Sequence, residues 1–535
     1  MAVKYAGDEE KTLGFDNNHI VSNENVRTSL FPGSYESFNE KGLDMDVPDK
    51  IGGFDTTIVS IRSMASSGSI HHPVKRDLSL WSNDSEDAEV AAPVQSPAKR
   101  GNRIYRFLRW NFFSAYRRLF TMVFVANISV LVALLVRPGS GPDRGLTLQG
   151  TINATSANLL LSILMRQEHV VNLLFLLSSS LRPATPLRMR RWLAKIYSYG
   201  GLHSGCGVAA VVWYLAFACL VTKHLVIEPY IEPAIAAITY IILCLFALIV
   251  AFAHPTLRAR LHDYFETTHR FAGWTVVILF WVQVVLTAHY DAMAVRTSSL
   301  GRGLILLPSF WSLIIITLCI VYPWARLRSR AVRAEYLSSH AIRLHFDTIK
   351  LDYCMTVRLS DNPIKETHAF AAIPNPNGAT GFSVVVSNAG DWTSRMIQQP
   401  PAKLWIRGAP TYNVLRVAVM FKRVLVVATG SGIGPCLSLF HGRPDLHCRI
   451  LWSGSSPVET FGLAVIEDVL KTDPKAVIID SKKAGRPDMV SLTYRIVKES
   501  KCEAVFVVSN PKVTRKVVYG METRGVPAYG PIFDS

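Results

Sequence analysis

Six apolar runs in the first 330 residues have the length of a membrane-crossing helix. They cover residues 119–136, 157–181, 202–221, 234–252, 271–288 and 304–324, and a helix needs about 20 apolar residues to cross a bilayer core. Arg166, Glu168 and His169 interrupt the second run, so either they lie inside the span or the helix begins after them. The pattern predicts a six-span transmembrane domain over residues 101–330.

The pattern changes after residue 324, where short segments alternate between apolar and polar positions. Segments 341–347, 353–360 and 382–388 are typical of strands, and they predict a small antiparallel β-barrel over residues 335–420. From Arg423 onward an apolar strand, a helix and a second strand follow in order, and residues 476–480 and 504–510 add two more strands. Strands that alternate with helices favour a parallel sheet, so residues 421–535 are predicted to form an α/β domain.

The distribution of charge changes how the composition is interpreted. The chain is 49% hydrophobic and 18% charged, with a formal net charge of +17. Arginines gather directly before the first apolar run and directly after the last one, and the loops after the second and fourth runs are also basic, as cytoplasmic flanks of membrane helices are. We therefore expect a lipid bilayer rather than a nucleic acid as the partner of these cations.

The same charge pattern predicts a multi-pass protein of the plasma membrane with both termini in the cytoplasm. Residues 1–100 are rich in Ser, Asp, Asn and Gly and lack a sustained period, which predicts a disordered cytoplasmic tail. Asn153-Ala154-Thr155 is a glycosylation sequon, which we expect in the first outer loop.

A glycine-rich stretch joins the first predicted strand of the α/β domain to the following helix. It reads Thr429-Gly430-Ser431-Gly432-Ile433-Gly434-Pro435. Glycines accept positive φ and let a phosphate approach the backbone, while a helix N-terminus offers unpaired N–H groups. The stretch is therefore either a cradle for a nucleotide pyrophosphate or a plain strand-to-helix turn.

Four further motifs stand in a fixed order around this loop. They are His368-Ala369-Phe370-Ala371, Gly390-Asp391-Trp392-Thr393, Gly485-Arg486-Pro487-Asp488 and Val507-Val508-Ser509-Asn510-Pro511. They resemble H-P-F-[ST], G-x-W-T, G-R-P-D and C-G-P of ferric reductases and NADPH oxidases, in the ferredoxin-reductase superfamily, whose nucleotide loop reads T-G-[ST]-G-[IV]-[AG]-P. The last 26 residues resemble fungal TmpA-type membrane flavoproteins, and related C-terminal halves occur in fungal adenylating-enzyme fusions.

The resemblance implies a membrane flavin oxidoreductase that passes electrons from NAD(P)H through FAD to an acceptor the sequence does not name. It implies that His368 and Phe370 line the isoalloxazine ring of FAD. It also implies that Trp392 and Thr393, which follow Gly390, hold the flavin phosphates.

For the nicotinamide nucleotide the resemblance implies two further groups. The pyrophosphate would lie against Thr429, Gly430, Gly432, Gly434 and Pro435. Ser509 would flank the nicotinamide ring, and Phe533 is the nearest candidate for the aromatic cap at the C-terminus. Residues 452–457 carry no arginine for a 2′-phosphate, so NADH and NADPH stay open.

Two departures from the family pattern favour an alternative function. Ala371 lacks the hydroxyl that can bond to the flavin, and Ser509 replaces the family's cysteine. The alternative is a regulatory, redox-sensing membrane flavoprotein with little turnover, acting in fungal development or signalling. A third hypothesis is a transporter or receptor whose C-terminal half is only structural, but the ordered motifs argue against it.

The histidines do not match the two-haem relay of the resembled family. That relay uses histidine pairs about 13 or 14 residues apart on the third and fifth spans, roughly 20 Å along a helix. Here His203 and His224, and His269 and His289, are 21 and 20 positions apart, roughly 30 Å. His203 and His269 lie at similar depth and either ligate a single haem b or are interfacial histidines among small residues that pack helix on helix.

Overall fold

A computed structural model describes residues 96–136, 145–227, 232–295 and 299–532 of the chain. Most of the predicted tail and the predicted cap Phe533 lie outside the described residues. Residues 96–100 are described, and Arg100 N donates to Thr523 O over 2.8 Å at the end of α17 (Pro511–Glu522).

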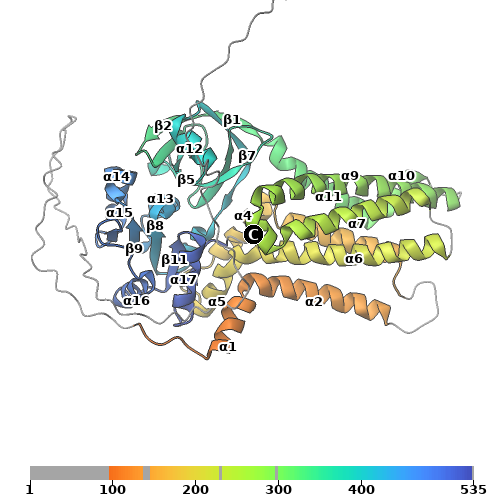
Figure 1. Ribbon diagram of the computed structural model, residues 1–535, viewed down its shortest axis with the longest axis horizontal. Coiled ribbons are helices and arrows are strands. Elements are labelled where there is room, and N and C mark those ends of the chain that lie inside the picture. The colour runs from red at the N-terminus through yellow and green to blue at the C-terminus, as the bar shows by residue number, and fades with distance from the viewer. Residues whose placement is uncertain (1–95, 137–144, 228–231, 296–298, 533–535) are drawn as a thin grey trace, which may run out of the picture. The chain divides into compact units, whose positions relative to one another are not determined.

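Helices make up the first part of the described chain (Figure 1). The long ones are α2 (Ala115–Leu135), α3 (Leu148–Leu164), α4 (Glu168–Ser179), α6 (Gly200–Val226), α7 (Pro233–Ala253), α9 (His262–Val295) and α11 (Pro308–Ala325). Shorter ones are α1 (Arg103–Arg106), a π-helical turn (Phe107–Phe112), α5 (Leu187–Leu193), α8 (Pro255–Arg260) and α10 (Leu300–Leu306). By length and composition, five helices of the described residues could cross a membrane, or six if the bent pair α3 and α4 is one span.

The second predicted span is not one straight helix. α3 begins before the predicted run and ends at Leu164, and α4 leaves it at an angle of 68°. Gln167 stabilises the break, because its side-chain oxygen accepts hydrogen bonds from the N–H groups of His169 and Val170 and so caps α4. Glu168 and His169 therefore begin a new helix. The sequence predicts them either inside one continuous span or before the start of the helix, and the structure shows neither arrangement.

The sequon is also placed differently from the prediction. Asn153 lies inside α3 and not in an outer loop. Thr147 starts this helix early, because its hydroxyl accepts a hydrogen bond from Gly150 N over 3.0 Å.

An antiparallel sheet of seven strands follows the helices. The strands are β1 (Arg328–Ala331), β2 (Arg333–Tyr336), β3 (Ala341–Phe346), β4 (Met355–Ser360), β5 (His368–Pro374), β6 (Phe382–Ser387) and β7 (Lys403–Tyr412), and α12 (Asp391–Gln398) packs on them. Their order is β1-β7-β4-β5-β6-β3-β2. The edge strands β1 and β2 are separated only by Val332, so the sheet is strongly curled. The sequence predicts a barrel, and the structure shows this curled sheet.

The last part of the chain forms the predicted parallel sheet. Its strands are β8 (Arg423–Thr429), β9 (His447–Gly454), β10 (Val477–Asp480), β11 (Ala504–Val508) and β12 (Ala528–Tyr529), in the order β10-β9-β8-β11-β12, all parallel. Helices α13 (Ile433–Gly442), α14 (Pro457–Phe461), α15 (Leu463–Thr472), α16 (Met489–Glu499) and α17 alternate with the strands. Separate apolar clusters cover the two faces of this sheet, as parallel sheets require.

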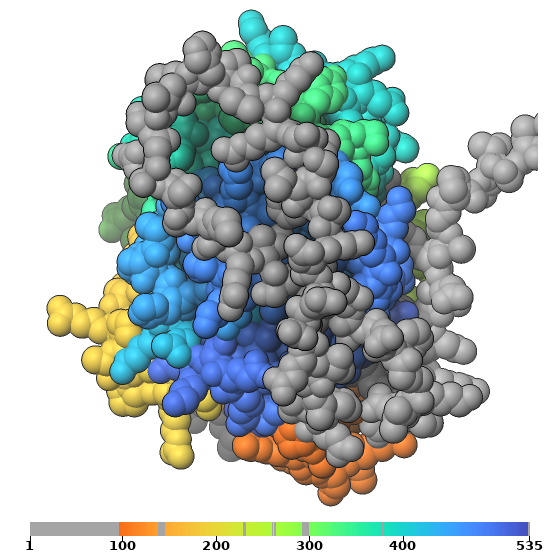
Figure 2. Space-filling view, turned by 90° about the vertical axis from the view of Figure 1, so that its left-hand side faces the viewer, coloured from red at the N-terminus to blue at the C-terminus, as the bar shows by residue number. Residues whose placement is uncertain are grey.

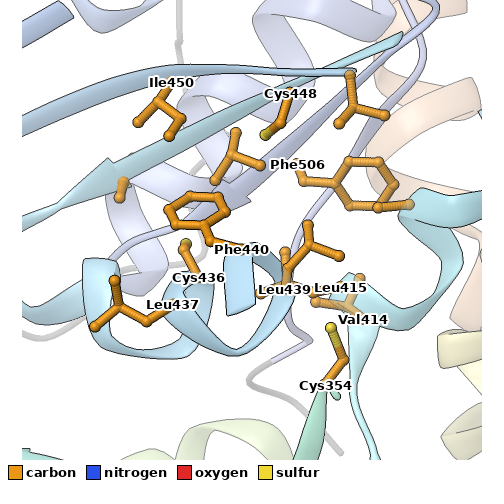
Figure 3. Packing of buried hydrophobic residues seen from close by; sticks show 14 of the residues in the cluster. Cys354, Val414, Leu415, Cys436, Leu437, Leu439, Phe440, Cys448, Ile450 and Phe506 are labelled. Carbon is orange, nitrogen blue, oxygen red and sulfur yellow. The ribbon is translucent and has the colours of Figure 1, made fainter. Parts of the chain in front are cut away.

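Helix α13 is packed between the two sheets. Figure 3 shows Cys436 and Phe440 of this helix near Cys448 and Ile450 of β9, with Cys354 of the curled sheet on the other side of the helix. Ser438 in the middle of α13 donates to Ala372 O of β5 over 2.5 Å and accepts from Cys354 N over 2.8 Å. Apolar packing and paired polar groups thus join the two sheets through one helix.

One buried ion pair joins the helices to the parallel sheet. Arg190 of α5 is 3% exposed, and its guanidinium donates to Glu503 Oε2 over 2.8 Å, to Met420 O over 2.9 Å and to Thr185 O over 2.8 Å. Glu503 also accepts from Lys422 N over 2.7 Å. Burial by itself would raise the pKa of Glu503, but the hydrogen bonds from Arg190 and Lys422 N outweigh it and hold this pKa below its ordinary value.

Replacing Glu503 with Gln should destabilise the fold by about 3 kcal/mol at neutral pH, because it leaves a buried guanidinium without its counter-charge. The matched control is Arg495→Ala, which removes a more exposed pair to Glu499 at 3.9 Å and should cost about 0.5 kcal/mol or less. The measurement is the free energy of unfolding of the detergent-solubilised protein by denaturant titration.

The pH dependence of this difference tests its electrostatic origin. The folded-state pKa of Glu503 is depressed, so its contribution is complete above the unfolded-state pKa of about 4.3 and is lost as the pH falls through the folded-state value. The difference in the free energy of unfolding between wild type and Glu503→Gln should therefore become smaller below about pH 4. A gap of the same size at pH 7 and at pH 3 would show that charge is not the cause.

Candidate functional site

The strand order of the parallel sheet reverses between β8 and β11, and we call the carboxyl ends of these two strands the crevice. From β8 the chain moves outward through β9 and β10, and it then returns to place β11 and β12 on the other side of β8. Ligands of open α/β sheets bind outside the carboxyl ends of the two strands at such a reversal. Here those ends carry residues 429–432 and residues 509–510, which are two of the sequence-predicted groups.

Contacts between these two strand ends fix the glycine loop. Thr429 Oγ1 and Ser509 Oγ are hydrogen bonded to each other, so the structure brings the predicted loop and the predicted nicotinamide residue together. A Cβ atom on Gly432 would overlap the carbonyl oxygen of Val508, and Gly430 has a φ of +50°, so both positions require glycine. The positive end of α13 begins directly after them.

Gly434 and Pro435, also predicted for the pyrophosphate, lie in the first turn of α13. A Cβ on Gly434 would lie 3.3 Å from Val385 Cβ of β6, so this glycine allows the helix to approach the curled sheet. Pro435 has no N–H to offer a ligand, and its fixed φ suits the first turn of a helix.

Trp452, which no motif of the sequence singles out, stabilises the glycine loop. Trp452 on β9 is fully buried, and its indole N–H donates to Gly430 O over 3.0 Å. This bond holds the one loop residue with a left-handed conformation. An apolar aromatic residue in a strand is most often only part of the core, so no sequence signal points to this role. The role follows from the pairing of Trp452 with Ala428 on the neighbouring strand β8.

The predicted flavin residues form an aromatic stack on the curled sheet. His368 and Phe370 lie on the same face of β5, and their rings are 4.4 Å and 5.7 Å from the ring of Trp392, with interplanar angles of 29° and 28°. Trp392 is 5% exposed and belongs to the apolar core of the curled sheet. It therefore packs against His368 and Phe370, and its predicted contact with the flavin phosphates stays a prediction.

Two buried polar atoms in this stack lack a partner within the described part of the chain. They are His368 Nε2 and Trp392 Nε1. Such atoms are costly unless a ligand or water satisfies them. Burial also lowers the pKa of His368, so its imidazole is neutral at pH 7.

Thr393 acts within its own loop. Its hydroxyl accepts from Ala389 N over 2.8 Å and from Gly390 N over 3.0 Å, and it donates to Gly390 O over 2.8 Å. The hydroxyl is thus fully used in shaping the turn before α12. The first-turn N–H groups of α12 have no intrahelical acceptor and are the donors that an anion would meet there.

A polar junction connects the helices to the curled sheet. Asn172 of α4 donates to Pro410 O and accepts from Tyr412 N, each over 2.9 Å, and so continues the hydrogen bonding of β7. Glu168 is 4% exposed, lies 3.8 Å from Arg358 and fills the space beside Gly408, which has a φ of +69°.

Arg407 of β7 lies at the same junction, with its guanidinium 5.1 Å from the ring centre of Trp324. Burial, followed by the nearby charge of Arg358, lowers the pKa of Arg407 to about 10. The guanidinium therefore stays charged at neutral pH, and the charges of Glu266 and Glu168 oppose the lowering of its pKa.

The two candidate haem ligands lie opposite each other between α6 and α9. The rings of His203 and His269 have centroids 6.3 Å apart. A separation of this size would leave room for one metal-centred group between the two rings. His203 Nδ1 lies 2.9 Å from Ser162 O, and donation to a backbone carbonyl is the usual way to orient a metal-ligating histidine.

The glycines near this pair serve different purposes. Gly201 and Gly205 lie against the backbone of α2 at Tyr116 and Phe120, which supports the helix-packing interpretation for them. A Cβ at Gly273, one turn after His269, would meet nothing within 4 Å, so space is open beside the pair.

Side chains fill the interior between α6, α7 and α9 in the parts of α6 and α9 that lie away from His203 and His269. The rings of Phe217, Phe246 and Phe280 surround Tyr214, with centroids 5.4 to 5.5 Å from it. Tyr214 donates to Gln283, which donates to Thr239 over 2.8 Å, so the buried polar groups satisfy one another. The residues here do not fit a second haem.

Comparison with known proteins identifies similar fungal sequences. Residues 414–535 match the family model "Adenylate-forming reductase 03009, C-terminal domain". The chain is 43% identical over 488 residues to adenylate-forming reductase 03009 of Coprinopsis cinerea, covering 91% of this chain and 46% of that protein. It is 44% identical over 482 residues to adenylate-forming reductase 06235 of the same fungus, covering 90% and 45%. The chain spans less than half the length of these relatives.

Similar solved structures include flavohemoglobin from Malassezia yamatoensis with bound FAD and heme. It has 12% identity and a TM-score of 0.35, and the match covers 72% of this chain and 98% of that one. The ferredoxin reductase of carbazole 1,9a-dioxygenase has 12% identity and a TM-score of 0.32, covering 39% and 70%. These values are too low to carry an argument about activity. The predicted likeness to adenylating-enzyme fusions agrees with the sequence matches, and the TmpA-type resemblance stays a prediction.

Trp452→Phe should weaken binding of NADH or NADPH about fivefold, because it removes one hydrogen bond worth about 1 kcal/mol while a smaller aromatic ring takes the place of the indole. We expect the change in KM, with kcat nearly constant, since the bond positions the loop and does not touch the reacting atoms. Trp213→Phe is the control, because it removes a similar indole bond to Asn127 within the helices. Equal effects of the two substitutions would show that Trp452 has only a structural role.

Proposed function

We propose that the chain is a membrane-embedded flavin oxidoreductase that passes electrons from NAD(P)H through FAD to a further acceptor. The observation that carries the proposal is the position of α13. The glycine loop of the crevice leads directly into its first turn, and its middle is hydrogen bonded to β5, the strand of His368 and Phe370. A hydride can pass between two cofactors only when they lie in contact, and this helix brings their candidate sites together.

The residues present on the curled sheet fit FAD. When bound, FAD accepts a hydride and releases electrons singly. His368 and Phe370 would line its ring system, and the unpaired His368 Nε2 and Trp392 Nε1 would gain partners. The N–H groups at the start of α12, held open by Thr393, would receive the phosphates.

At the crevice, the chain's own residues would bind and orient the nicotinamide nucleotide. The loop from Thr429 to Gly432 would receive the pyrophosphate at the positive end of α13. The hydroxyl of Ser509 would lie beside the nicotinamide, positioned by its bond to Thr429. The relatives are named reductases, which agrees with this chemistry.

We further propose that the long apolar helices cross the plasma membrane, with the sheets and both termini on the cytoplasmic side. Support comes from five or six helices of sufficient length and apolarity and from the basic residues at their ends. The aromatic packing and paired polar groups inside these helices are also those of a membrane bundle.

The second candidate function is a redox sensor that binds the same cofactors and turns over slowly. The bond between Thr429 and Ser509 favours it, because the residue at the nicotinamide position is held by another side chain. Sustained oxidation of NADH or NADPH by the purified protein would rule the sensor out. Reduction of the bound flavin without sustained turnover would support it.

His368→Ala should lose most of the bound flavin, because it removes a ring from the stack and opens a cavity beside Trp392. The measurement is the visible absorbance of FAD in protein purified in mild detergent, before and after addition of NADH or NADPH. His345→Ala is the control, since His345 lies on β3 of the same sheet and pairs with Glu335. Wild-type protein with no flavin after reconstitution with FAD would end the proposal.

We propose that His203 and His269 also ligate one haem b, on the strength of their 6.3 Å ring separation. A Soret band should be present in the purified protein and lost in both His203→Ala and His269→Ala. It should persist in His289→Ala, which changes an exposed histidine at the other end of α9. If no Soret band appears after haem is supplied during expression, the two histidines are a packing contact.

A further inference from the structure

The short segment that precedes α2 turns an apolar face toward solvent. Ile104, Leu108 and Phe112 follow each other at intervals of four residues, which places them on one side of a helical segment. They are 71%, 42% and 49% exposed, and Tyr105 and Phe107 beside them are about half exposed. An exposed cluster of this size marks an interaction surface rather than a chance surface residue.

The opposite side of this segment is fixed to the parallel-sheet part of the chain. Trp110 packs edge-on against Tyr519 of α17 with centroids 6.4 Å apart. Pro97 lies just before the segment in the chain, and its carbonyl oxygen accepts a hydrogen bond from Arg524, which follows α17, over 2.9 Å. Figure 2 shows the orange N-terminal segment directly against the blue C-terminal part. Because these contacts fix one side, the apolar side cannot rotate into the protein to escape water.

The sequence around the segment selects the partner that would cover it. Residues 96–135 contain no Asp or Glu, Arg109 lies within the segment, and Arg117 and Arg118 follow it in the first turn of α2. Arg118 also donates to Phe113 O over 2.7 Å, which fixes the bend between the π-helical turn and α2. Ser114 then caps α2, one of the helices able to cross a membrane. The apolar face therefore lies where a membrane-crossing helix would enter the lipid.

We propose that residues 103–113 lie in the plane of the membrane surface, with their apolar face at the acyl boundary and their arginines on anionic phospholipid headgroups. This inference rests on the proposed membrane location. An apolar face with cations beside it is the arrangement by which amphipathic helices bind anionic leaflets. Because the same segment contacts α17, lipid binding also anchors the helix that follows Ser509 in the crevice.

The test is hydrogen–deuterium exchange of the full-length protein in nanodiscs made with and without phosphatidylserine. We expect exchange of the backbone amides of residues 103–113 to be several-fold slower in the anionic discs, and high salt should reduce the difference. Arg109→Glu with Arg117→Glu should remove the lipid dependence. Leu108→Asp with Phe112→Asp should speed exchange in both lipids, whereas Ile364→Asp, a control at a 73% exposed site, should not.

Each outcome of this experiment decides between explanations. Equal exchange in neutral and anionic discs overturns the proposal, as does protection that appears only with a co-purified protein. The comparison of lipids uses the wild-type chain, so it does not depend on how a variant folds. α7 serves as the internal reference: fast exchange there would contradict the membrane location itself, while slow exchange in α7 with fast exchange in residues 103–113 would contradict only the lipid-binding segment.

Discussion

The buried guanidinium of Arg190 is the interaction on which the connection between helices and sheets depends. A cation removed from water is tolerated only when its donors are satisfied by fixed acceptors. Arg190 finds them on three segments: its own turn at Thr185, the connection between the two sheets at Met420, and the start of β11 at Glu503. These acceptors are far apart in the sequence, so the pair forms only when all three segments are in place.

Further polar contacts act beside this pair. Lys195 donates to Glu522 of α17 over 2.6 Å, and Tyr529 OH donates to Arg191 O over 3.3 Å. Asn172 makes the equivalent connection to the curled sheet through β7. Both sheets are thus tied to the helices by directional bonds to backbone and carboxylate groups. The apolar packing of α13 then ties the sheets to each other.

Much of this architecture follows from local pattern. The strand-helix alternation after Arg423 predicts the parallel sheet, and the glycine loop is placed correctly at its edge because only glycine tolerates the close approach of Gly432 to Val508. The apolar runs also predict the long helices, because the length and the apolarity of a segment can be seen from its own residues. The sequence does not predict the contact between Thr429 and Ser509, because it depends on β8 and β11 being neighbours in the sheet.

What the sequence does not predict depends on contacts between distant segments. The break at Gln167 needs a side-chain cap, which one apolar run with three polar interruptions does not reveal. Trp392 is drawn into the core because His368 and Phe370 lie above it, a relation set by how α12 packs on β5. Nothing in the sequence around Arg190 or Trp452 marks either residue as important. Their roles come from their hydrogen bonds to Glu503, which lies far away in the sequence, and to Gly430 O, in the loop after the neighbouring strand β8.

The density of these ties bears on whether the chain is an enzyme or a sensor. A sensor that signals by movement needs an element with two arrangements of similar free energy. The contacts of Arg190, Lys195 and Asn172 instead hold the sheets to the helices in one arrangement. A flavin on the curled sheet that passes electrons to an acceptor among the helices, as proposed above, would need such a fixed distance. These contacts therefore support the proposed oxidoreductase, whereas the hydroxyl pair of Thr429 and Ser509 supports the sensor.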